Sequence, residues 1–417
     1  MLIVVGLLVG VVAGYVSYSS FPDGSARFAE ITQLLPNAFL RLIKMIISPL
    51  VFTTLVVGIA KMGDINTVGR IGGKALGWFI FASLISLTLG LIVVGLFEPG
   101  KAMQLPIPAS EASSGISAES LTLAGLISHT IPTSIIDAMA RNEILQIVVF
   151  SLFFGTAMAA LGERTKPLVA MIDTVAHIML KVTGYVMLLA PIAVFGAMAS
   201  IVAKEGLGII RVYGLLMGEF YLGIAILWLV LILLGVVIVG PRVLRLVRRI
   251  REPVLLAFST ASSEAAYPKT LEELERFGVS NRIASFVLPV GYSFNLDGSM
   301  MYCTFAVMFI AQVYGIDIPI GQQILMVALL MLTSKGIAGV PRASLVVIAA
   351  TLSQFNIPEA GLLLLLGIDH FLDMGRSATN VVGNSIATAV VAKWERELDA
   401  EGPDDAPSPQ PVKSAAG

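Results

Sequence analysis

Apolar residues run along this chain in blocks that are long enough to cross a membrane. The runs from Ala75 to Phe97 and from Phe220 to Gly240 hold no charged residue, and each exceeds the roughly 20 residues that span a hydrocarbon core. They are too rich in leucine and glycine for barrel strands, and helices are the other element that spans a bilayer. The pattern predicts an all-α polytopic membrane protein.

The last apolar run, from Leu362 to Ala392, differs because polar side chains interrupt it at helical spacing. They are Asp369, Asp373, Arg376, Asn380 and Asn384. At about 100° per residue all five fall within roughly 80° of arc, so they share one face of a helix. Ionisable groups at membrane depth are costly and normally face a protein interior or a water-filled path. This polar stripe is the first candidate for function.

Two further apolar segments are broken by small and polar residues, so neither predicts an unbroken spanning helix. Leu255–Tyr267 contains the run STASSE, and Leu325–Val347 contains SKGIAGVPR. A longer apolar stretch with its own polar interruption follows each of them: NLDG at residues 295–298 after the first, and the polar stripe after the second. This repetition indicates an inverted-repeat transporter with two re-entrant hairpins.

Composition supports the membrane class and excludes others. The 417 residues are 56% hydrophobic and 13% charged, with a mean hydropathy of +0.89, which is too apolar for a soluble globular protein. The formal net charge of −1 gives no field that would attract nucleic acid. The single cysteine, Cys303, excludes internal disulfides and cysteine-built metal sites, and it is expected to be a small buried residue.

Basic residues set the expected orientation in the cell membrane. They gather in Lys61–Lys74, Arg164–Lys166 and Arg242–Arg251, and the positive-inside rule places these linkers in the cytoplasm. The opening run, Met1–Ser20, lacks a basic start and a cleavage site and is expected to be the first membrane helix. A multi-pass protein with both termini in the cytoplasm follows. The charged, proline-rich tail is expected to be disordered.

Four motifs carry a resemblance to a known family. They are SSEAAYP at residues 262–268, NLDG at 295–298, SKGIAGVP at 334–341 and DMGRSATN at 373–380. In this order they resemble the dicarboxylate/amino acid:cation symporters, over about residues 1–396. The resemblance implies eight transmembrane helices, two re-entrant helical hairpins, a homotrimer, and a transport domain that moves like an elevator against a fixed scaffold.

The resemblance also implies a division of the chain. The expected parts are scaffold helices 1–2 at residues 1–74, transport-domain helix 3 at 75–98, scaffold helices 4–5 with an external loop at 99–202, helix 6 and a basic cytoplasmic linker at 203–251, hairpin 1 and helix 7 at 252–315, hairpin 2 and helix 8 at 316–396, and a disordered cytoplasmic tail at 397–417.

Arg376 is the strongest single candidate for substrate binding, because a guanidinium that faces a polar cavity binds a carboxylate through two hydrogen bonds. An internal ion pair with Asp369 or Asp373 is the alternative. By resemblance Asp373 holds a substrate ammonium, with a structural role beside Arg376 as its alternative. The expected substrate contacts are Ser263, Ser299, Val340, Ser344, Asp373, Arg376, Ser377 and Asn380.

Asp297 is an acid in the middle of an apolar span, and the resemblance implies that it binds a coupling cation such as Na⁺. Oxygen ligands suit such an ion. The expected cation-binding residues are Gly291, Ser293, Asn295, Leu296, Asp297, Ser334, Ile337, Asn380 and Asn384. Asn384 stands where sodium-coupled members carry an aspartate, and Phe79 and Ala82 replace a tyrosine and a threonine, which weakens two sodium sites.

Two charged residues depart from the family pattern. Glu264 lies in the first broken segment and is a candidate proton carrier, since a buried carboxylate can bind and release a proton near neutral pH. A hydrogen bond that stabilises the tip is the alternative. Arg342 lies in the second broken segment and is a candidate gate charge that attracts an acidic substrate, with a solvent-facing arginine as the alternative.

These inferences predict a symporter for acidic amino acids, glutamate or aspartate, coupled to H⁺ or Na⁺ or both and using no cofactor. The alternative within the class is a C4-dicarboxylate symporter for succinate, fumarate or malate, which the absence of an arginine in the first hairpin and the presence of Asn384 support. A channel is a further possibility. An intramembrane aspartyl protease that uses Asp297 and Asp373 is a different class, but the sequence lacks the motifs of such enzymes. We therefore expect no enzyme activity.

Overall fold

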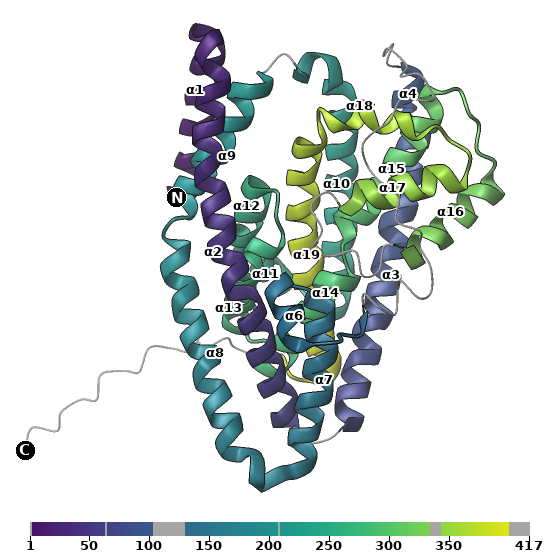
Figure 1. Cartoon of the computed structure of the whole chain (residues 1–417). Coiled ribbons are helices and arrows are strands. Elements are labelled where there is room, and N and C mark those ends of the chain that lie inside the picture. Colours follow the sequence, from purple (N-terminus) through teal and green to yellow (C-terminus); the bar gives the residue numbers. More distant parts are fainter. Residues whose placement is uncertain (1, 63–64, 103–129, 207–208, 334–342, 400–417) are drawn as a thin grey trace, which may run out of the picture.

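The computed structural model describes residues 2–62, 65–102, 130–206, 209–333 and 343–399, and nearly all of these form helices (Figure 1). In this part of the chain the β structure consists of one isolated antiparallel bridge between Val279 and Leu398. The helices belong to two groups that pack side by side. An all-α fold was expected from the sequence, and the described residues confirm it.

The first group holds the N-terminal helices and their partners. It consists of α1 (Leu2–Ser20), α2 (Pro22–Met62), α6 (Ile135–Arg141), α7 (Ile144–Leu161), α8 (Lys166–Met187) and α9 (Ala190–Glu205). Helices α1 and α9 lie along each other (Figure 1). Glycines permit this contact, since a Cβ at Gly10 would lie 2.6 Å from the carbonyl oxygen of Phe195. Small residues at such interfaces let membrane helices approach closely.

The second group surrounds α19 (Asp369–Glu395), the helix that carries the polar stripe. Its neighbours are α10 (Ile209–Val239), α12 (Arg251–Thr260), α14 (Asn281–Phe294) and α15 (Asp297–Val313). The group also includes α3 (Ile65–Phe97), α4 (Pro99–Ala102), α11 (Val243–Arg249), α13 (Tyr267–Phe277), α16 (Ile320–Thr333), α17 (Ala343–Gln354) and α18 (Leu362–Leu366). A helix that is covered on all sides can hold polar side chains away from lipid.

The first broken segment is a helical hairpin. Helix α12 ends where Ala261 adopts a left-handed conformation with φ of 49°, and the short η2 (Glu264–Ala266) then leads into α13 (Tyr267–Phe277), which has a proline in its first turn. Helices α12 and α13 have 10 and 11 residues, and α16 and α17 have 14 and 12. Each is shorter than the roughly 20 residues of a spanning helix.

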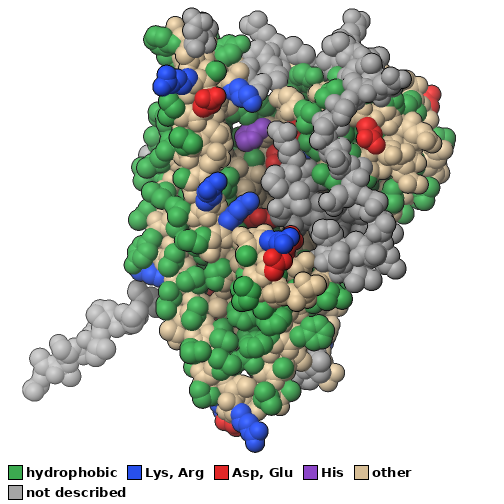
Figure 2. Space-filling view, viewed as in Figure 1, with side chains coloured by type: hydrophobic (Ala, Val, Ile, Leu, Met, Phe, Trp, Pro, Cys, Tyr) green, Lys and Arg blue, Asp and Glu red, His purple; other side chains and the backbone are tan. Residues whose placement is uncertain are grey.

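Five helical segments of the described chain are long and apolar enough to cross a membrane. They are Gly24–Ala60, Asn66–Lys101, Ile144–Met187, Tyr213–Val239 and Asn281–Val313. Large apolar side chains also lie on the surface, among them Leu188 at 75% exposure and Phe153 at 76%, and Figure 2 shows such side chains over much of one face. An apolar surface of this kind fits a protein that lies in lipid.

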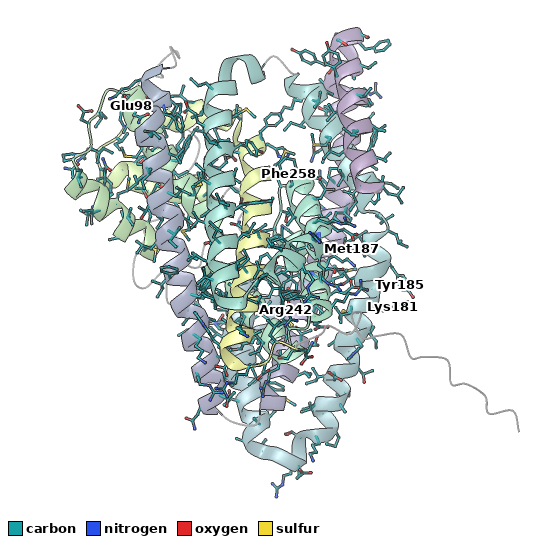
Figure 3. The ribbon with its side chains drawn as sticks, turned by 180° about the vertical axis from the view of Figure 1, so that it is seen from behind. Glu98, Lys181, Tyr185, Met187, Arg242 and Phe258 are labelled. Atoms are coloured by element: carbon teal, nitrogen blue, oxygen red, sulfur yellow. The ribbon has the colours of Figure 1, made fainter. Side chains whose placement is uncertain are left out.

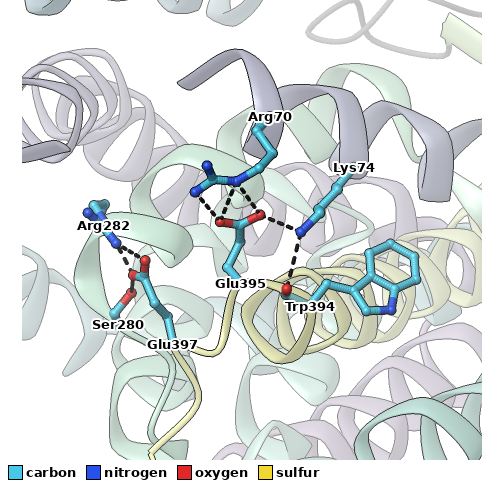
Figure 4. Close-up of polar contacts among 7 residues, drawn as sticks. All are labelled: Arg70, Lys74, Ser280, Arg282, Trp394, Glu395 and Glu397. Atoms are coloured by element: carbon cyan, nitrogen blue, oxygen red, sulfur yellow. Dashed lines mark hydrogen bonds and ion pairs between the residues drawn. The ribbon is translucent and has the colours of Figure 1, made fainter. Parts of the chain in front are cut away.

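The end of α19 is held by charged side chains from distant parts of the chain (Figure 4). Glu395 accepts hydrogen bonds from Arg70 at 2.9 Å and from Lys74 at 2.6 Å. Glu397 pairs with Arg282 and accepts a hydrogen bond from Ser280. The part of the expected tail that the structure describes, residues 397–399, therefore lies against residues 278–282. The rest of the tail lies outside the described residues.

Candidate functional site

The polar stripe of α19 is almost entirely buried. Asp369, Arg376, Asn380 and Asn384 are between 1% and 4% exposed, and the side chain of Asp373 is 32% exposed. The helical spacing predicted that these residues share one face, and they contact α14 and α15 together. Two clusters form along this face, one around Arg376 and one around Asp297.

Arg376 lies in an acidic and aromatic pocket. Its Nη2 is 3.0 Å from Oδ1 of Asp369 and 2.9 Å from Oδ1 of Asp373. The Arg376 guanidinium lies over the ring of Tyr302, with 4.1 Å between Cζ and the ring centroid, and the Tyr302 hydroxyl donates to Asp369 at 3.3 Å. The internal ion pair that we weighed as an alternative role for Arg376 is thus present in this state.

Part of the Arg376 guanidinium has no partner among the described residues. Its Nε and Nη1 atoms are buried and have no hydrogen-bond partner within the described residues. Buried N–H groups without a partner are costly and rare in folded proteins, so a missing acceptor explains them best. A carboxylate has the charge and the geometry to accept from a guanidinium edge.

Asn380 supports the broken helix at NLDG. Its Oδ1 accepts from the backbone N–H of Gly298 at 2.9 Å and of Ser299 at 3.4 Å, and its Nδ2 donates to the Ser299 hydroxyl at 3.3 Å. The amide thus caps the start of α15, whose first N–H groups have no partner within the helix. Two of the expected substrate contacts, Asn380 and Ser299, are engaged with each other in this state.

The second cluster is centred on Asp297, whose side chain is fully buried. Oδ1 accepts from the Ser86 hydroxyl at 3.2 Å, and Oδ2 accepts from the Asn295 amide at 3.0 Å. The same amide donates to Oδ1 of Asn384 at 3.2 Å. The candidate cation ligands Asn295, Asp297 and Asn384 are therefore brought together in one cluster.

Two glycines make room for these polar side chains. A Cβ at Gly383 would collide with the carboxylate of Asp297, and a Cβ at Gly291 would collide with Oδ1 of Asn384. Two polar atoms of the cluster, Asn295 Oδ1 and Asn384 Nδ2, are buried without a hydrogen-bond partner within the described residues, and so is Oγ of the candidate ligand Ser293 on α14. Unsatisfied oxygens beside a buried carboxylate match the ligands that a hard cation prefers.

The remaining candidates are spread around these clusters. Ser263 immediately precedes η2, and Glu264 begins it, half-buried at the tip of the first hairpin. Ser377 is 5% exposed on α19, and Ser344 lies half-buried in the first turn of α17. Leu296 precedes α15 at its break. The candidates Ser334, Ile337, Val340 and Arg342 lie outside the described residues.

Sequence reasoning missed three residues of the site: Ser86, Tyr302 and Gly383. Ser86 lies on α3 one helical turn beyond Ala82, and its hydroxyl also donates to the Ala82 carbonyl. The helical spacing from Phe79 to Ala82 continues to residue 86, so this spacing could have identified Ser86. Tyr302 and Gly383 act through packing between helices, and no local pattern marks such contacts.

Broken helices around a buried charged cluster are typical of membrane transporters for small charged solutes. The chain belongs to the sodium:dicarboxylate symporter family, whose model matches residues 1–394. The resemblance seen in the four motifs is thereby confirmed.

Curated relatives cover nearly the whole chain. A protein of Laribacter hongkongensis is 40% identical over 407 residues, which cover 96% of this chain and 90% of the relative. One from Bacillus subtilis is 38% identical over 95% of this chain and 93% of the relative, and one from Rhizobium johnstonii is 43% identical over 88% and 84%. Each is named a C4-dicarboxylate transport protein. These names agree with the alternative that we set beside acidic amino acid uptake.

Proposed function

We propose that this protein is a cation-coupled symporter of C4-dicarboxylates such as succinate, fumarate and malate. The observation that carries the proposal is the buried Arg376 guanidinium, whose Nε and Nη1 lack acceptors. One carboxylate of the substrate accepts hydrogen bonds from this edge. The names of the relatives support the substrate class.

Asp373 bears on the choice between a dicarboxylate and an amino acid. We expected this acid to hold a substrate ammonium, yet its carboxylate is 2.9 Å from Arg376, so it has a partner without any ligand. Its partial exposure makes it the acid that an incoming carboxylate can displace from the guanidinium. Acidic amino acids remain the second candidate, because a displaced Asp373 would be available to an ammonium group.

The charge of the site explains why a cation must travel with the substrate. Among the described residues of this cluster Arg376 is the one base and Asp369 and Asp373 are two acids, so these three side chains together carry one net negative charge. A dicarboxylate brings two more negative charges into a buried environment, where unpaired charge is strongly unfavourable. Protons or metal cations that bind with the substrate remove this penalty.

Two positions are proposed for the coupling cations. Asp297, with the oxygens of Asn295, Asn384 and Ser293, forms the proposed site for a monovalent cation such as Na⁺. Glu264, half-buried at the tip of the first hairpin, is the proposed proton carrier. A Glu264→Gln variant then loses uptake driven by a pH gradient and keeps substrate binding, whereas unchanged pH-driven uptake would exclude this role.

The proposal extends to the transport mechanism. Eight membrane spans with two re-entrant hairpins, an elevator movement, a homotrimer and a cell-membrane location with cytoplasmic termini are what the family resemblance implies. The four short helices of the two broken segments and the separate packing of two helix groups support this arrangement.

Equilibrium binding tests the substrate class. Radiolabelled succinate is bound to the purified protein in the presence of Na⁺ at neutral pH, and unlabelled fumarate, L-aspartate and butyrate compete for it. Competition by fumarate, weak competition by L-aspartate and none by butyrate is the expected order, since butyrate has one carboxylate. Stronger competition by L-aspartate than by fumarate would favour the amino acid function.

A further inference from the structure

A cavity of about 1300 Å³ lies between the two helix groups, and neither Arg376 nor Asp297 lines it. The first group contributes Leu2 and Ile3 of α1 and the turn from Met187 to Pro191. The second group contributes one side each of α10, α12 and α19. In Figure 3 the labelled Phe258 of α12 and Met187 lie at this boundary. The cavity exceeds the roughly 300–1,000 Å³ of ordinary small-molecule pockets.

The cavity is lined mainly by apolar groups. On α19 the lining residues are Gly375, Ala378 and Val382, which lie roughly 100–160° around the helix from Arg376. Trp228 of α10 donates its ring N–H to Thr379 at 2.8 Å, so its polar atom is satisfied and its ring remains as lining. An apolar ligand in the cavity therefore contacts the back of the helix that carries the polar stripe.

The cavity opens towards the lipid-facing surface. Two of its lining residues, Leu2 and Leu188, are 72% and 75% exposed. Large apolar side chains of a membrane protein that are this exposed contact hydrocarbon. An acyl chain of the bilayer can therefore enter the cavity without crossing water, which a soluble ligand could not do.

One end of the cavity carries unpaired positive charge. Arg251 lines it at the start of α12, and Arg248 lies one turn earlier on α11. Both are exposed, and neither forms an ion pair or hydrogen bond within the described chain. Glu252 also lines this end, but its carboxylate interacts electrostatically with the ammonium group of Lys269 on α13. Basic residues beside an apolar cleft between membrane helices are suited to anionic lipid headgroups.

We propose that this cavity binds one anionic phospholipid, with an acyl chain between α1 and α10 and its phosphate at Arg251 and Arg248. The lipid fills the boundary between the two helix groups and packs against Gly375, Ala378 and Val382. Any movement of one group against the other must reshape this boundary. The bound lipid therefore sets how readily the groups move, and the transport rate depends on anionic lipid.

Lipid retention tests the proposal on the full-length protein. The protein is purified from vesicles of phosphatidylcholine with phosphatidylglycerol, and the phosphatidylglycerol molecules retained after detergent washing are counted by native mass spectrometry. Arg251→Ala should weaken retention about fivefold, as expected for one interfacial basic residue. Ala225→Trp, which fills the cavity from α10, should abolish retention.

Matched controls separate this site from general lipid contact. Arg164→Ala removes an exposed basic residue in a turn outside the cavity, and Val237→Trp adds bulk at an 82% exposed position of α10. Both should retain lipid like the wild type. Equal retention by Arg251→Ala and Arg164→Ala, or no preference for phosphatidylglycerol over phosphatidylcholine, would overturn the proposal. If Ala225→Trp does not fold, the phosphatidylglycerol retention of Arg251→Ala alone tests the proposal.

Discussion

Asp373 and Arg376 form an ion pair in which only the acid is open to solvent: the carboxylate is 32% exposed and the guanidinium is 1% exposed, at a distance of 2.9 Å. This asymmetry makes Asp373 a competitor of the substrate carboxylate for the same guanidinium. Asp373→Asn removes the competing charge, so we expect succinate to bind severalfold more tightly, as radioligand binding can measure.

The same variant separates the two candidate substrates. If Asp373 held a substrate ammonium, Asp373→Asn would abolish L-aspartate binding without improving succinate binding, and that result would contradict the proposed role. Asp369→Asn is the comparison, because Asp369 is buried and accepts from both Arg376 and Tyr302. This second change should destabilise the protein rather than tighten binding, since it removes a buried partner of a charged group.

Arg376 should not tolerate replacement by lysine. Arg376→Lys keeps the positive charge but loses the planar set of donors and the stacking against Tyr302, and a hydrogen bond to a charged group contributes roughly 1.5–3 kcal/mol. We expect succinate affinity to fall at least about tenfold. Arg141→Lys, in an exposed pair with Asp137, is the control and should bind as the wild type does. Equal affinity of both variants would exclude Arg376 from the site.

Gly383 should be essential to the proposed cation site, because a Cβ there would collide with the Asp297 carboxylate. Gly383→Ala should displace Asp297 and weaken the stimulation of succinate binding by Na⁺ or by low pH. Overpacking of this kind costs roughly 1–3 kcal/mol. Gly77→Ala on α3, where no atom lies within 4 Å of the new Cβ, should leave the stimulation unchanged. Cation titrations of succinate binding measure both, and a wild-type response from Gly383→Ala would count against this site.

Stability at acid pH should depend on Glu395, the last residue of α19 and beyond its apolar part. The hydrogen bond from Arg70, reinforced by Lys74, holds the pKa of the Glu395 carboxyl below its usual value of 4.5. A group with a lowered folded-state pKa stabilises the fold above its unfolded pKa, and this contribution is lost as the pH falls through the folded-state value.

Glu395→Gln should therefore lower the thermal stability of the detergent-solubilised protein at neutral pH, by roughly 1 kcal/mol because Arg70 is half-exposed. The difference from wild type should shrink as the pH falls below 4.5. Glu163→Gln, which breaks an exposed pair with Lys166, should change little at any pH. A Glu395→Gln deficit that persists unchanged at low pH would contradict the assignment.

Sequence periodicity predicted the part of the site that lies on one helix. The spacing of Asp369, Asp373 and Arg376 follows from helical geometry, and their mutual contacts follow with it. Asp297 lies buried beside Asn295 and Asn384, and it was the family resemblance rather than helical geometry that placed these three residues in one expected cation site.

Contacts between helices could not be predicted in this way. Ser86 reaches Asp297 from α3, and Gly383 approaches it from α19, so both depend on how separate helices pack. The pairing of residues 397–399 with residues 278–280 could not be predicted either. A charged and proline-rich composition predicts disorder, and the sequence alone does not show which distant residues such a segment contacts.

Succinate uptake into proteoliposomes under imposed gradients tests the central claim most directly. Radiolabelled succinate and L-aspartate are compared in vesicles with an inward Na⁺ gradient, an inward proton gradient, or neither. We predict that succinate accumulates above its external concentration when at least one gradient is present, that it does not accumulate without a gradient, and that L-aspartate accumulates far less. Two results would contradict cation-coupled dicarboxylate transport: accumulation of L-aspartate but not of succinate, or succinate entry at a rate that depends on neither gradient.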